Sequence, residues 1–142
     1  MSDCAALEEL LAVSQLRYDH QRQAFEKILG KESRLRVELA RLDEMGRSTA
    51  QEAEAVDSMR AIGADLLWQG WLGRSRTKLN MQLARILAIK EFEQRKVKRA
   101  FGKVIALEEV IREQKKIKRA DTARRMLDQA VEHSLTNRNE NL

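Results

Sequence analysis

The sequence predicts an all-α protein, a long antiparallel two-helix coiled-coil hairpin with a short helix or loop at its tip. Of its 142 residues 35% are charged, 4% are aromatic and none is proline, which is typical of long helices rather than of a globular core. Apolar residues recur at alternating steps of four and three in two long stretches. The short connection between these stretches favours helices that fold back on each other as one domain spanning residues 1–142.

The first helix is predicted over residues 3–46. Ser2 or Asp3 can cap its start, because a side-chain oxygen there accepts hydrogen bonds from the free amides of the first turn. Ser14, Gln21 and Glu32 interrupt the apolar seam, and polar seam residues lower stability but can fix the register. The seam positions are Leu7, Leu11, Ser14, Tyr18, Gln21, Phe25, Ile28, Glu32, Leu35, Leu39, Leu42 and Gly46.

The tip is predicted over residues 47–65. Gly46 is expected to end the first helix, because glycine tolerates the left-handed conformation of a helix terminus. Thr49 and Glu52 have the spacing of a capping box, which favours a short helix over residues 50–61 that ends near Gly63. A plain loop is the alternative, and in either case Asp65 is expected to cap the next helix.

The second long helix is predicted over residues 66–135, with a frayed tail over residues 136–142. Lys90 and Glu93 interrupt its seam, and beyond Gln114 the apolar phase drifts through Ile117 and Leu127. This helix is longer than the first, so its basic C-terminal end is expected to overhang. The seam positions are Leu79, Leu83, Ile86, Lys90, Glu93, Val97, Ala100, Val104, Leu107, Ile111 and Gln114.

Trp68 and Trp71 stand beside Gly70 and Gly73 at the start of the second helix. In an antiparallel hairpin the tryptophans come close to Leu42 and Met45. They either close the seam where it splays or form a docking knob, since tryptophan is enriched among binding hot spots. Each glycine costs a helix about 1 kcal/mol relative to alanine, so we expect a kink or a close backbone approach there.

Clustered catalytic or metal-binding residues are missing from the sequence pattern. His20 and His133 are far apart, Cys4 has no partner for an intrachain disulfide, and "GWLGRS" lacks the spacing of a P-loop. We therefore expect no enzyme activity, no cofactor and no metal. The N-terminus does not resemble a signal peptide and no run of 18 apolar residues occurs, which favours a cytoplasmic protein without membrane insertion.

The net charge of +5 is unevenly distributed. Residues 1–66 hold nine Lys/Arg and thirteen Asp/Glu, and residues 67–142 hold eighteen and nine. This asymmetry favours complementary pairing of the two halves. The basic runs 90–103 and 112–125 also suit an acidic protein partner. Nucleic-acid binding is disfavoured because the runs lie within and after the heptads and lack interleaved aromatics, and membrane adsorption lacks a broad apolar face.

The layout resembles the FliJ/YscO-type stalk proteins of type III export systems. The resemblance rests on aromatics just after the tip (Trp68, Trp71, followed by Leu72), on the apolar run from Leu79 to Ile111, and on the stretch "EEVIREQKKIKRADTARRMLDQA". The two glycines near the tip depart from the unbroken stalk of that family. The resemblance implies a hairpin fold similar to the rotary-stalk subunit of F-type ATPases.

The resemblance also implies a role between a hexameric export ATPase and a membrane export gate of the FlhA type, in either a flagellar or a virulence system. Export chaperones are further implied partners. Trp68, Trp71, Leu42 and Met45 are then the candidate gate-binding residues. The candidate ATPase-binding residues are Lys115, Lys116, Lys118, Arg119, Arg124 and Arg125.

Two alternatives stay open at this point. A parallel homodimeric coiled coil could serve as a scaffold, and its hydrodynamic behaviour would differ from that of an elongated monomer. A basic helical protein could bind nucleic acid, and such binding would weaken steeply with rising salt.

Overall fold

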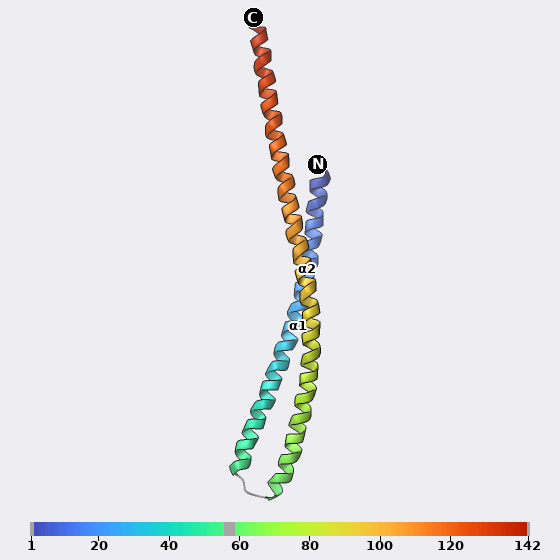
Figure 1. Ribbon diagram of the computed structural model, residues 1–142, viewed down its shortest axis with the longest axis vertical. Coiled ribbons are helices and arrows are strands. Elements are labelled where there is room, and N and C mark those ends of the chain that lie inside the picture. Colours follow the sequence, from blue (N-terminus) through green and yellow to red (C-terminus); the bar gives the residue numbers. More distant parts are fainter. Residues whose placement is uncertain (1, 56–58, 142) are drawn as a thin grey trace. The chain divides into compact units, whose positions relative to one another are not determined.

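The chain forms two long α-helices, α1 (Ser2–Ala55) and α2 (Met59–Glu140) (Figure 1). A computed structural model describes the backbone of residues 2–55 and 59–141 and the side chains of residues 3–52 and 63–141. No strand occurs in these ranges. The predicted all-α class is confirmed, and it is the expected result for a chain that is rich in helix formers and has no proline to interrupt them.

The charges at the helix ends suit the helix dipoles. Asp3 lies in the first turn of α1, where the amide ends carry partial positive charge. Arg138 lies in the last turn of α2, beside the free carbonyl groups. α2 continues as a helix to Glu140, five residues past the end predicted at residue 135, so most of the tail that was predicted to fray is helical.

The chain divides into two units, each containing a segment of both helices. In the unit of residues 19–98, Asp43 pairs with Arg76 and Glu32 with Lys90. Residue numbers that rise along α1 thus fall along α2, so the two segments are antiparallel (Figure 1).

The other unit comprises residues 1–18 and 99–142, and its helix segments are antiparallel too. The rings of Tyr18 and Phe101 lie 5.5 Å apart, and Glu8 pairs with Lys115. Within this unit α2 continues well past the start of α1 (Figure 1). The predicted antiparallel hairpin is therefore confirmed by the pairing inside each unit.

The interface is a narrow seam that coincides with the predicted heptads. All twelve predicted positions of α1 are buried or half-buried, and so are those of α2 except Gln114, which is exposed. Val104, Ile111 and Glu32 are the most buried side chains among those described. The sequence pattern therefore locates the seam almost residue by residue.

The predicted helix boundaries around the tip are wrong. α1 passes through Gly46 and ends at Ala55, and α2 begins at Met59, so Asp65 lies inside a helix rather than at its cap. Glycines with positive φ are absent from the described ranges, so neither Gly46 nor Gly63 acts as a left-handed terminus. The short helix predicted over residues 50–61 partly falls on residues 56–58, which lie outside the described residues.

Packing explains why α1 does not stop at Gly46. A Cβ built on Gly46 would lie 3.9 Å from Cδ1 of Leu72, so this glycine sits against an α2 side chain in the seam. Asp43 pairs with Arg76 just before it, and Thr49 contacts Trp68 just after it. These cross-helix contacts offset the roughly 1 kcal/mol by which glycine weakens a helix.

Candidate interaction sites

The two tryptophans of α2 form a stacked pair. Their ring centroids lie 5.0 Å apart and their planes are inclined by 20°. Trp68 is 37% exposed and Trp71 is 43% exposed, so both keep part of their surface open to a partner. Stacking limits the motion of both rings, which suits binding because little side-chain entropy remains to be lost.

A hydrogen bond to Thr49 of α1 holds the ring of Trp68, which belongs to α2. Nε1 of Trp68 donates a hydrogen bond to Oγ1 of Thr49 (2.8 Å), and this hydroxyl donates in turn to the carbonyl oxygen of Met45 (2.7 Å). Thr49 therefore acts as an anchor for an aromatic ring and not as a helix cap. The sequence carries no signal for this bond, because its partners are nineteen positions apart and belong to different helices.

The structure gives separate observations for the four residues predicted to bind the gate. Trp68 is bonded to Thr49 and stacked on Trp71, and Thr49 also donates to the backbone carbonyl of Met45, whose side chain is 43% exposed. Leu42 lines a groove between the helices together with Leu72 and Arg76. The aromatic pair thus contributes both to hairpin closure, through Trp68, and to the exposed surface, through both rings.

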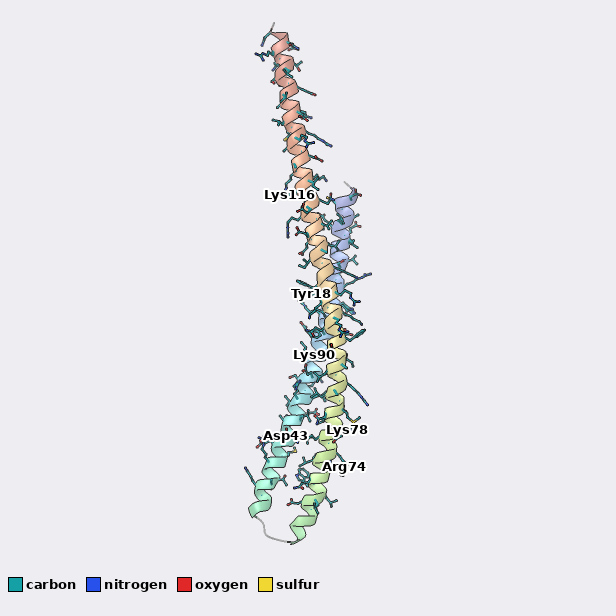
Figure 2. The ribbon with its side chains drawn as sticks, in the orientation of Figure 1. Tyr18, Asp43, Arg74, Lys78, Lys90 and Lys116 are labelled. Atoms are coloured by element: carbon teal, nitrogen blue, oxygen red, sulfur yellow. The ribbon has the colours of Figure 1, made fainter. Side chains whose placement is uncertain are left out.

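A charged layer crosses the seam in the middle of the unit of residues 19–98. Oε2 of Glu32 lies 2.9 Å from Nζ of Lys90, and Oε1 accepts hydrogen bonds from Arg36 (3.1 and 3.2 Å). The hydrogen bond from Lys90, together with the weaker effect of that from Arg36, lowers the pKa of Glu32. Figure 2 shows Lys90 at this level of α2. The sequence marks these residues as seam interruptions but does not say that they meet.

All six basic residues predicted to bind the ATPase are exposed on α2. Lys115 pairs with Glu8 at 3.5 Å, and Figure 2 places Lys116 next to it on the same helix. Lys115, Lys118 and Arg119 share one face and line a shallow groove with Met126. Every described residue from Arg112 to Asn141 is exposed, so this segment, named here the extension, offers its charges to solvent on all sides.

The described residues offer neither a metal site nor a membrane-spanning segment. Within these ranges no three His, Cys, Asp or Glu side chains come together in a way that could hold a metal ion. Neither helix, as far as it is described, has a segment both long and apolar enough to cross a bilayer.

No family model, curated protein or solved structure matches this chain.

Proposed function

We propose that this protein is a non-enzymatic stalk or adaptor of a type III protein export apparatus, located in the cytoplasm and peripheral to the membrane. In this role it inserts into a hexameric export ATPase and links the ATPase to the membrane export gate. Export chaperones are further partners in the proposal. The observation that carries it is that a single helix, α2, bears an exposed aromatic pair near its start and an exposed basic extension near its end.

The extension suits insertion into a ring lined with carboxylates. Seven basic and two acidic residues lie between positions 112 and 125, and this stretch is exposed throughout. Complementary charge speeds association and fixes the orientation of a complex more than it adds raw affinity. A cationic helix is therefore expected to enter an acidic ring quickly and in a defined direction.

The aromatic pair suits a compact protein contact. Trp71 has no hydrogen-bonded role in the described residues and is 43% exposed, so its ring is available to a partner. Truncating a tryptophan hot spot typically costs about 2 kcal/mol or more of binding energy. On this proposal Trp71 is the principal gate contact and Trp68 positions it.

The decisive experiment is co-purification and affinity measurement with a hexameric export ATPase. Lys116→Glu/Arg119→Glu is expected to weaken ATPase binding about tenfold or more, because it reverses two exposed charges of the extension. The matched control is Lys27→Glu/Lys31→Glu, which makes the same charge change at exposed positions of α1, outside both basic runs. Equal affinity for the two double variants would remove the assignment.

The gate contact is tested separately with the cytoplasmic part of the export gate. Trp71→Ala is expected to preserve helicity and to weaken binding roughly thirtyfold, corresponding to about 2 kcal/mol. Phe92→Ala is the control, because Phe92 is another exposed aromatic of α2, at 57%. A large loss of helicity in Trp71→Ala would show that the ring closes the hairpin instead.

A further inference from the structure

A groove runs along one face of α2 in the unit of residues 19–98, and only α2 residues line it. Arg74, Lys78 and Arg85 line the groove, and so does Met81. Met81 is 55% exposed. Figure 2 shows Arg74 and Lys78 on this part of α2. This outer groove is separate from the aromatic pair and from the extension.

The three cations of the outer groove lack an anionic partner among the described residues. Arg76, close by on the same helix, pairs with Asp43 at 3.3 Å, but Arg74, Lys78 and Arg85 take part in no ion pair within the described ranges. Three like charges on one face repel one another. Their charge is complementary to an acidic partner, which would relieve that repulsion.

The groove has the shape that a helix requires. It extends from Gly70 to Arg85, about 22 Å along the helix axis. In the groove lining, Gly70 and Thr77 are one step of seven apart, as are Lys78 and Arg85, and a heptad is the repeat with which a second helix packs alongside the first. Exposed Met81 lies on the same face, and its thioether gains from contact with apolar side chains and little from a phosphate backbone.

Gly70 and Gly73 leave space on this face of α2 for a second helix to approach. A Cβ at Gly73 would meet nothing within 4 Å, so no described part of the chain needs this position to be glycine. A Cβ at Gly70 would meet only the flexible end of Arg74, at 3.3 Å. Glycine nevertheless weakens a helix relative to alanine. A backbone that approaches from outside the chain explains this choice, since interaxial distances near 8 Å require small residues.

We propose that the outer groove, lined by Arg74, Lys78 and Arg85, is the docking surface for an acidic α-helix of a partner protein. Side chains of that helix fill the hollow over Gly70 and Gly73 and cover Met81, and its carboxylates pair with the three cations. This inference goes beyond the proposed export role and does not depend on it, because it uses none of the residues assigned to the ATPase or to the gate.

The probe is a synthetic helical peptide of three heptads, with leucine and alanine on one stripe and glutamate on both flanks. Its affinity for the full-length protein is measured by fluorescence anisotropy. The same peptide with lysine in place of glutamate is the control ligand. The glutamate peptide is expected to bind at least tenfold more tightly, and equal affinities would overturn the proposal.

Two protein variants place the binding on the outer groove. Gly73→Leu is expected to raise the melting temperature, because leucine is the better helix former, yet to weaken peptide binding at least tenfold by filling the hollow. Gly102→Leu is the matched control, since Gly102 is an exposed α2 glycine with no atom within 4 Å of a built Cβ. It is expected to raise the melting temperature as well and to leave binding within twofold. Equal binding by the two variants contradicts the proposal.

Charge is tested in the same way. Arg74→Glu/Lys78→Glu is expected to weaken binding of the glutamate peptide at least tenfold, and Lys27→Glu/Lys98→Glu, at exposed positions outside the groove, by no more than twofold. Similar losses in both double variants would show that only net charge matters, which overturns the proposal.

If the outer groove binds a second copy of this chain or a membrane surface instead, each would give a different experimental result. Sedimentation velocity would reveal a dimer that Gly73→Leu dissolves if the occupant is a second copy of this chain. Flotation with phosphatidylglycerol vesicles would show binding that Arg74→Glu/Lys78→Glu abolishes if the occupant is a membrane. Either result would replace the acidic partner helix and overturn the proposal.

Discussion

Residues 99–111 and the extension belong to the same helix and the same unit, yet only the first stretch has a buried face. The first stretch holds Val104 and Ile111, which are 6% and 7% exposed, whereas every described residue of the extension is exposed. Helical periodicity is present in both. The difference lies in the residues that occupy the seam phase, because beyond Ile111 this phase passes to Gln114 and Lys118 instead of to apolar side chains.

The comparison shows that helix formation and helix pairing are encoded separately. Residues rich in helix propensity make α2 continuous, and the heptad phase decides where α1 can cover it. Lys115 still reaches α1 through Glu8, at 3.5 Å. Beyond that point α2 has apolar residues such as Ile117 and Leu127, but they lie off the seam phase and are 55% and 66% exposed. Past Lys115, the described residues of the extension are therefore exposed to solvent.

The largest expected effect comes from deleting a seam side chain. Ile111→Ala is expected to lower the free energy of unfolding by about 2–4 kcal/mol, because it removes buried methyl groups and leaves a gap. Ile117→Ala, the same substitution further along α2, is expected to change it by no more than about 0.5 kcal/mol. Urea unfolding monitored by circular dichroism measures both. Comparable losses would mean that the extension is packed after all.

A second, smaller effect is expected at charged seam positions. Lys90→Leu leaves Glu32 without its partner on α2 and should lower the melting temperature, whereas Glu32→Leu/Lys90→Leu should recover or exceed the wild-type value because an apolar pair fits the seam. Lys115→Leu is the comparison at an exposed pair and should have little effect. Thermal melts measure all three.

The double variant also tests whether the charged layer selects the register. Sedimentation velocity on Glu32→Leu/Lys90→Leu is expected to reveal additional oligomers, because an apolar seam permits alternative registers and partners. A purely monomeric double variant with raised stability would show that the charged layer has no such role.

The smallest expected effect is a pH dependence. The hydrogen bond from Lys90, together with that from Arg36, lowers the pKa of Glu32 in the folded state. A lowered pKa means that the unfolded chain binds this proton more strongly than the folded protein does. The ionised Glu32 side chain therefore stabilises the fold at pH values above its unfolded-state pKa, about 4.3. This stabilisation is lost as the pH falls through the pKa of Glu32 in the folded state. The melting temperature of wild type should therefore fall more steeply below about pH 4.3 than that of Glu32→Gln. Parallel curves would exclude this contribution.

The candidate sites are predictable from the sequence to different degrees. The basic runs and the greater length of the second helix predict the exposed basic residues of the extension, because a helix end without a partner helix exposes all its charges. Trp68 and Trp71 attract attention because the chain has only two tryptophans. No pattern of neighbouring residues predicts Thr49 as the anchor of Trp68, since a hydrogen bond between the two helices has no sequence pattern. Leu42 is predicted to lie near the aromatic residues, and the groove that it lines together with Leu72 could not be located from the sequence.

By itself the sequence determined the helical class and the seam, because a heptad of apolar residues is a direct result of the geometry of paired helices. The course of the chain near the tip was decided by tertiary structure. There the local signals of Gly46 and Asp65, worth about 1 kcal/mol each, predict helix ends. Cross-helix contacts of Leu72, Arg76 and Trp68 keep the helices continuous instead, and they depend on residues far apart in the sequence.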